Sequence, residues 1–156
     1  MSVKENLEEL RQHIPSGCTL IAVSKTQPPE KIIEAYNCGQ RVFGENRSQE
    51  LASKQNILPK DIEWHMIGHL QTNKVKYIAP FVALIHSVDS IKLLEEIDRQ
   101  AKKSQRVIPC LLQVHIAEEE TKFGFSPDEV LRLIESSIWK DLANIEIRGL
   151  MGMATF

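Results

Sequence analysis

Apolar residues recur along this chain in two alternating arrangements, one at helical spacing and one in short continuous runs. Ser2 and Glu5 form a capping box, which predicts that a helix begins there. Apolar residues then recur at helical spacing, at Val3, Leu7, Leu10 and Ile14. The next run, residues 18–25, has strand length and does not alternate with polar residues, so we expect a parallel strand buried on both faces.

The same alternation of strand and helix continues to the end of the sequence. Strands are expected over residues 18–25, 41–44, 63–67, 81–86, 106–116 and 145–151. Helices are expected from Pro29 to Gly39, over 47–55, over 72–78, after an Asp89 cap, and after a second capping box at Ser126 and Glu129. Six such units predict a parallel sheet covered by helices.

Two α/β architectures fit this alternation. A doubly wound open sheet suits about 150 residues, whereas a (β/α)8 barrel needs eight strands and typically about 250 residues. Length favours the open sheet. The sequence stops at residues 152–156, directly after a strand, which is instead typical of a barrel cut after its sixth strand.

Composition and charge indicate the number of domains, the kinds of partner and the cellular compartment to expect. The chain has 156 residues with 42% hydrophobic residues and a formal charge of −2, which predicts one domain. Charged residues form no long block of one sign, so no nucleic-acid partner is expected. The three cysteines are far apart in the sequence, which predicts reduced thiols. The sequence contains no apolar run of about 18 residues, so no membrane-spanning helix is expected. We therefore expect a cytoplasmic protein.

Lys25 is the candidate reactive residue, because it directly continues an apolar strand. Desolvation disfavours the charged form of a lysine, and lowering its pKa from about 10.4 by about three units leaves about a quarter of the amine neutral at pH 7. A neutral amine attacks aldehydes. The alternative is a solvated lysine at the end of a strand.

Other polar residues follow the strands without forming a specific motif. His65 and His69 have the spacing of a metal-binding pair, but Gly68 and the strand before it break the helix that such a pair requires. A core or site-lining role is therefore favoured for His65, and a surface role for His69. Asn46 lies at a strand-to-helix turn, where it can meet a ligand or cap the helix. Dinucleotide, P-loop and serine-hydrolase motifs are absent from the sequence.

Five segments taken together resemble the pyridoxal 5′-phosphate (PLP) homeostasis protein family, whose members are also called YggS, PROSC and PLP-binding protein. The segments are Ile21-Ala-Val-Ser-Lys-Thr26, Phe43-Gly-Glu-Asn46 with Gln49-Glu50, Trp64-His-Met-Ile-Gly-His-Leu-Gln-Thr-Asn-Lys74, His86-Ser-Val-Asp89 and Arg148-Gly-Leu-Met-Gly-Met153. They follow the family order over nearly the whole chain. Gly68-His69 departs from the usual Gly-Pro, and Arg47-Ser48 also differ.

The resemblance implies a TIM-type (β/α)8 barrel of the alanine racemase N-terminal type, with about six of its eight units present. It implies that Lys25 holds PLP as an imine (Schiff base), with Asn46 and His65 near the cofactor and Lys122 in a loop near the barrel mouth. Members are thought to store PLP or deliver it to apo-enzymes, and have no established catalytic activity. A racemase-like PLP enzyme is the alternative.

The resemblance also implies that the family's phosphate-binding elements lie beyond residue 156. We therefore expect a fragment or a truncated product whose barrel has two unpaired edges. Such edges predict weak PLP binding, or association with a second copy or a complementing piece. An inert fragment that binds no PLP is the third interpretation.

Overall fold

The computed structural model describes residues 2–116 and 123–153. The helices are α1 (Val3–His13), α2 (Pro29–Asn37), α3 (Ser48–Ile57), α4 (Ile91–Lys103) and α5 (Pro127–Ser136), with short 3-10 helices η1 (Thr72–Tyr77) and η2 (Ile138–Asp141). The strands are β1 (Ala22–Val23), β2 (Val42–Glu45), β3 (Glu63–Met66), β4 (Leu84–Val88), β5 (Ile108–Val114) and β6 (Ile145–Gly152).

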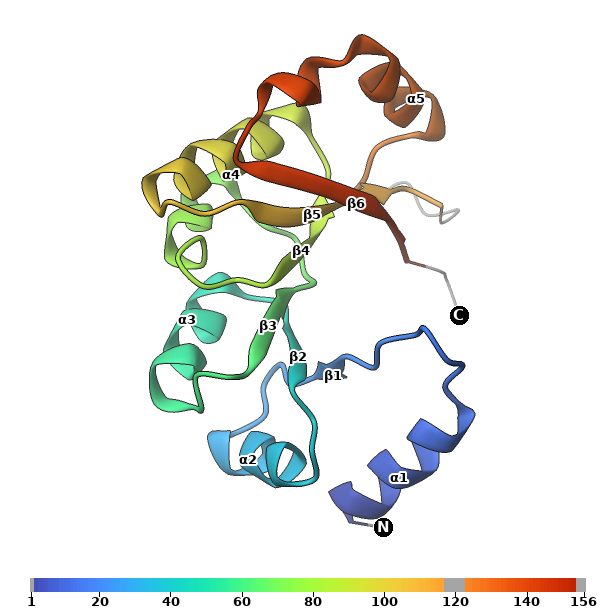
Figure 1. The fold of residues 1–156 in the computed structure, drawn as a ribbon, viewed down its shortest axis with the longest axis vertical. Coiled ribbons are helices and arrows are strands. Elements are labelled where there is room, and N and C mark those ends of the chain that lie inside the picture. Colours follow the sequence, from blue (N-terminus) through green and yellow to red (C-terminus); the bar gives the residue numbers. More distant parts are fainter. Residues whose placement is uncertain (1, 117–122, 154–156) are drawn as a thin grey trace.

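The six strands form one parallel sheet in the order in which they occur along the chain. A doubly wound sheet reverses its strand order at a switch point, whereas a barrel does not. Figure 1 shows α2, α3 and α4 following one another along one side of the sheet. The fold is therefore that of part of a (β/α) barrel, and the expectation of an open doubly wound sheet from length alone is wrong.

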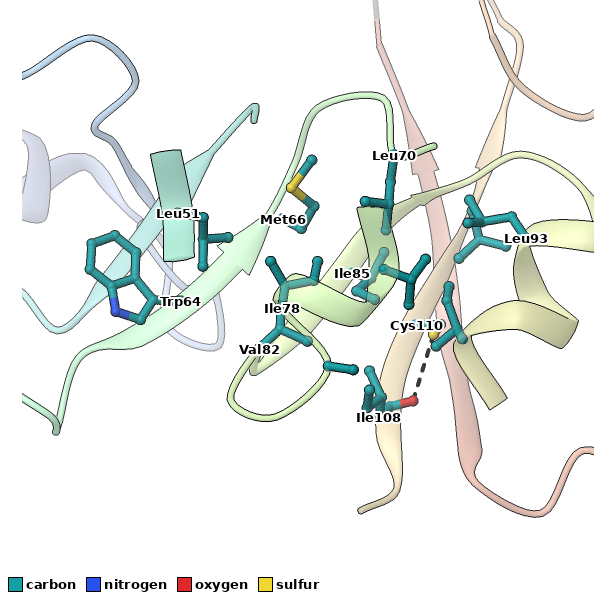
Figure 2. Close-up of a cluster of buried hydrophobic side chains, with 14 of the residues drawn as sticks. Leu51, Trp64, Met66, Leu70, Ile78, Val82, Ile85, Leu93, Ile108 and Cys110 are labelled. Atoms are coloured by element: carbon teal, nitrogen blue, oxygen red, sulfur yellow. Dashed lines mark hydrogen bonds between the residues drawn. The ribbon is translucent and has the colours of Figure 1, made fainter. Parts of the chain in front are cut away.

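The hydrophobic core lies between the sheet and this row of helices. Apolar side chains from the helices and from alternate strand positions fill it, and Figure 2 labels Leu51, Trp64, Met66, Leu70, Ile78, Val82, Ile85, Leu93, Ile108 and Cys110. Because each strand contributes every second residue to this layer, the opposite face of the sheet is left for other side chains.

Helix starts follow the capping residues closely. Ser2 and Ser126 form the two expected capping boxes. The cap of α4 was placed one residue too early: Ser90 is its N-cap, with its hydroxyl accepting a hydrogen bond from the Leu93 amide. Asp89 instead pairs with His69. Asp89 and Ser90 are consecutive, and both residue types are good N-caps, so the sequence pattern does not distinguish between them.

The first strand differs most from its prediction. Only Ala22 and Val23 pair with β2, and the Val23 side chain is 52% exposed. β1 is an edge strand with a single neighbour among the described residues, and the face that a closed barrel would cover is open there. The expected burial on both faces is therefore wrong.

Gly68 should not tolerate a side chain. A Cβ at this position would lie 2.5 Å from the Asn46 carbonyl oxygen and 2.6 Å from the Asn46 Cα, where β2 and β3 approach each other at their carboxyl ends. We expect Gly68→Ala to lower the free energy of unfolding by about 2–3 kcal/mol in urea titrations. At Gly44 the nearest atom would be the movable tip of Ile67, so Gly44→Ala should cost less. Equal losses would contradict this account.

Candidate functional site

Four of the candidate side chains belong to the carboxyl ends of adjacent strands. Lys25 comes two residues after Val23 of β1, and Asn46 directly follows β2. Gly44 pairs with both Val23 and His65, so His65 belongs to the same sheet face as Val23. His86 joins this face from β4, where its ring contacts His65. These four residues therefore lie at or near one edge of the sheet.

Lys25 occupies the corner of a tight turn and is exposed. The Gln27 amide donates to the Ser24 carbonyl oxygen at 3.0 Å, which closes the turn around Lys25 and Thr26. Thr26 has a φ of 63°, a conformation that glycine or asparagine normally supplies in such turns. The expected desolvation of Lys25 is wrong, because β1 ends at an open edge and its last turn faces solvent.

A buried charged cluster lies directly behind this turn, and we call it the Lys54 cluster: Ser24, Thr26, Glu45, Glu50 and Lys54. The Lys54 ammonium donates to the Ser24 carbonyl at 2.8 Å and to one oxygen each of Glu45 and Glu50 at 2.7 Å. Ser24 Oγ donates to the same Glu45 oxygen at 2.6 Å, and the Thr26 amide donates to Glu50 at 2.8 Å.

Hydrogen bonding within the Lys54 cluster favours the charged form of Glu50. The hydrogen bond from Lys54 lowers the pKa of Glu50 against the opposing effect of desolvation, and the Thr26 amide acts in the same direction as Lys54. The second oxygen of Glu45, Oε2, is buried and has no hydrogen-bond partner among the described residues. Lys54 is thus the centre of the cluster, with every bond directed at a carbonyl or carboxylate oxygen.

The Lys54 cluster is not predicted by any motif in the sequence. Glu50 and Lys54 are four residues apart on α3, a spacing that usually indicates a solvated surface pair. Glu45 is the last residue of a mostly apolar strand. A carboxylate at such a buried position needs a hydrogen-bonding or charged partner, and this is the sequence signal that indicates a polar cluster here.

His65 and His86 form a neutral pair on the other face of the sheet. His65 Nδ1 and His86 Nε2 lie 2.8 Å apart, so one donates and the other accepts, and at least one ring is neutral. Burial, and secondarily the nearby His86, lowers the pKa of His65 to about 4. Burial also lowers the pKa of His86. At pH 7 both rings therefore act as neutral hydrogen-bonding groups.

Asn46 is half-buried beside Gly68 and does not cap α3. Arg47 is the N-cap residue, without a side-chain capping bond, so the helix-cap alternative for Asn46 is wrong. Its position at the carboxyl edge of the sheet leaves the ligand-binding interpretation as the remaining prediction.

His69 is directed away from His65. Its Nδ1 pairs with Asp89 Oδ2 at 3.1 Å, and its ring stacks on Phe123 with centroids 3.7 Å apart. No group of three or more potential metal ligands occurs in residues 2–116 and 123–153. Lys122, the fourth predicted site residue, lies outside the described residues.

Cys110 is a buried core residue without nucleophilic activation. Burial raises the pKa of the Cys110 thiol to about 12, as expected for a core cysteine.

Across the described part of the chain, no helix has both the length and the apolarity needed to cross a membrane.

Comparisons with known proteins agree with this parallel α/β barrel architecture. Residues 1–155 match the family described as alanine racemase, N-terminal domain. Alanine racemase from Bartonella henselae shares the fold at 17% identity, with a TM-score of 0.71 over 96% of this chain and 42% of that chain.

More similar proteins define the family within this fold. The pyridoxal phosphate homeostasis protein of Aquifex aeolicus (strain VF5) is 42% identical over 162 residues, which cover 97% of this chain and 70% of that protein. PipY of Synechococcus elongatus PCC7942, solved without PLP, gives a TM-score of 0.89 at 40% identity over 96% of this chain and 70% of that chain. The structure of PipY with PLP bound gives a TM-score of 0.86 at 39% identity, over 99% of this chain and 71% of that chain.

The chain thus has the fold of the alanine racemase N-terminal domain. Within that fold it belongs to the pyridoxal phosphate homeostasis protein family, as the sequence resemblance indicated. It spans about 70% of the length of the Aquifex aeolicus protein and of PipY.

The histidine pair should make the fold sensitive to mild acid. The folded pKa of His65, about 4, lies below its ordinary value of 6.5, so the unfolded state binds more protons between these values. Stability is therefore complete above about pH 6.5 and is lost as the pH falls toward 4. The urea midpoint should fall across this window.

The variant His65→Gln should show a smaller fall than wild type. His13→Gln is the control, because His13 is exposed on α1 and contacts only its own helix carbonyl at Glu9. It should keep the wild-type pH dependence. An unchanged pH dependence in His65→Gln would show that the pair does not carry the effect.

Proposed function

We propose that this chain binds PLP as an imine on Lys25 and takes part in PLP homeostasis by storing the cofactor reversibly and passing it to apo-enzymes. The observation that carries the proposal is the location of Lys25: an exposed amine in a fixed turn at the carboxyl edge of a barrel-type sheet. This is the edge where such barrels place their reactive groups. Family membership and the PLP-bound relative support it.

The chemistry needs one amine and one aldehyde. Lys25 Nζ attacks the aldehyde carbon, the C=N bond forms, and the carbonyl oxygen leaves as water. Because water or another amine reverses the reaction, the linkage suits storage and transfer. In residues 2–116 and 123–153, Lys25 has no ion-pair partner, so its amine is not held by a carboxylate.

Asn46, His65 and Lys122 are proposed as cofactor-binding neighbours. Asn46 offers an amide at the same edge as Lys25, and His65 offers a neutral imidazole on the inner face. A neutral ring can hydrogen-bond or pack against the cofactor without adding a charge. For Lys122 the support is its match to the family loop.

Lys25→Ala should abolish the imine. PLP added to wild type should produce an imine absorbance band, and borohydride reduction should fix the pyridoxyl group on the peptide that contains Lys25, identified by mass spectrometry. Lys31→Ala is the control, because Lys31 is an exposed lysine on α2 that pairs only with Glu34. A band of equal strength in Lys25→Ala would disprove the assignment.

The same preparation tests for catalysis. After PLP is added, L-alanine is supplied and D-alanine is measured by chiral chromatography. We expect an imine band without D-alanine above the Lys25→Ala background. Lys25-dependent turnover would instead establish the racemase-like alternative.

We further propose that two copies associate through the sheet edges. β1 and β6 each have one strand neighbour in the described part of the chain, and both carry exposed apolar residues, Val23 at 52% and Leu150 at 60% exposure. Unpaired strand edges of this kind pair readily with another chain. A shallow groove of about 330 Å³ between α5 and β6 extends the apolar surface beside Leu150.

Light scattering should give a mass above that of one 17.8 kDa chain. Leu150→Lys should shift the protein toward the monomer, because a charge on an edge strand opposes pairing. Ile57→Lys is the matched control, since Ile57 is 67% exposed at the end of α3, away from both edges. A stable monomer in the wild type would contradict the proposal.

A further inference from the structure

We infer that the Lys54 cluster is a positioning device that fixes the backbone on both sides of Lys25. The inference concerns the backbone geometry of Lys25 and rests on the proposed function only for its consequence in PLP binding. Glu50 and Lys54 are positioning residues, because they contact the turn and not the reactive amine.

The two peptide groups that flank Lys25 are each bound by one charged side chain of α3. The carbonyl of the peptide before Lys25, that of Ser24, accepts from Lys54 Nζ at 2.8 Å. The amide of the peptide after Lys25, that of Thr26, donates to Glu50 Oε1 at 2.8 Å. Lys54 and Glu50 in turn contact each other at 2.7 Å. Lys25 is therefore clamped between the two ends of one ion pair.

The sheet itself holds this segment weakly. β1 pairs with β2 over only two residues, Ala22 and Val23, and it has no other strand neighbour among the described residues. Beyond this ladder the Ser24 amide donates to the Gly44 carbonyl oxygen at 3.0 Å, and Lys25 and Thr26 follow outside the ladder. The Lys54 cluster constrains the turn from the helix side of the sheet. Lys54 and Glu45 are both buried there, with exposed fractions of 6% and 0%.

The conformation of Thr26 shows that the turn needs such a constraint. Its φ of 63° is an outlier for a β-branched residue, and strain of this kind persists only where the surroundings enforce it. Two contacts hold Thr26 in this conformation: the bond from its amide to Glu50, and the bond from the Gln27 amide to the Ser24 carbonyl oxygen that closes the turn. Strained backbone next to a reactive residue is a recurrent feature of functional sites.

Buried charges are an expensive way to obtain stability alone. An ion pair of this kind is often no more stabilising than apolar residues of similar size, because desolvation offsets the attraction. Charged groups do provide directional bonds to specific carbonyl and amide groups, which apolar packing cannot. The Lys54 cluster uses these bonds on the two peptides around Lys25, which favours a positioning role.

The test compares Glu50→Ala with Glu50→Gln. Both Lys54 and the Thr26 amide donate to the same Glu50 oxygen, so the glutamine carbonyl can accept both bonds whereas alanine accepts neither. Glu34→Ala is the matched control, because Glu34 is a helix carboxylate paired with a lysine on α2, outside the Lys54 cluster. The Glu50 side chain is 25% exposed, so its truncation leaves no sealed cavity.

The first measurement needs no PLP. Backbone NMR order parameters at Lys25 and Thr26 should be about 0.85 in wild type, Glu50→Gln and Glu34→Ala, and should fall below about 0.6 in Glu50→Ala. Rigid residues 25 and 26 in Glu50→Ala would overturn the inference.

The second measurement uses PLP. The Kd should rise about tenfold in Glu50→Ala, and the visible circular dichroism per mole of imine should fall, because a mobile lysine no longer holds the chromophore in one orientation. Glu50→Gln should remain within about twofold of wild type. An unchanged Kd and dichroism in Glu50→Ala would also overturn the inference.

The two measurements separate this inference from the proposed function. If wild type forms no imine while the order parameters respond as expected, the clamp is established and the PLP proposal fails. A loss of thermal stability without change in order parameters or dichroism would assign the Lys54 cluster a purely structural role and overturn the inference.

Discussion

A single buried ammonium group determines how the first strand meets the rest of the fold. Lys54 reaches from α3 to the Ser24 carbonyl and neutralises two carboxylates that burial would otherwise make costly. Removing the ammonium would leave Glu45 buried without a cation and would remove one of the hydrogen bonds that hold the turn after β1. The geometry at the carboxyl edge of the sheet therefore depends on this group more than on the short β1–β2 ladder.

Much of the fold follows from local rules that act independently of tertiary context. Serine caps, a proline at the first helical position and apolar spacing place α1, α2 and α5, and a largely apolar run places β5. The predicted burial of β1 is wrong because an apolar sequence indicates only that a strand is suited to burial. Whether the strand is buried depends on the strands and helices that pack against it. The architecture came from the family resemblance, because length alone favoured the wrong sheet.

The candidate site was predictable only in part, for a similar reason. Lys25 and Asn46 stand out because strand ends in parallel α/β folds are where polar residues gather. The partnership of His65 with His86 joins residues 21 positions apart, and that of Lys54 with Ser24 spans 30. Neither has a sequence motif, since each depends on the register between strands or on how α3 packs behind β1.

The alternation of strand side chains separates two kinds of polar group. Glu45 pairs in register with Met66 and belongs to the helix side, whereas its neighbour Gly44 pairs with His65 on the other face. The carboxylates of the Lys54 cluster are thus behind the sheet, and the inner face carries neutral imidazoles. A carboxylate beside Lys25 would favour its protonated, unreactive form. Holding the Lys25 backbone with charges on the far side of the sheet fixes the lysine in place, and no carboxylate of residues 2–116 and 123–153 pairs with its amine.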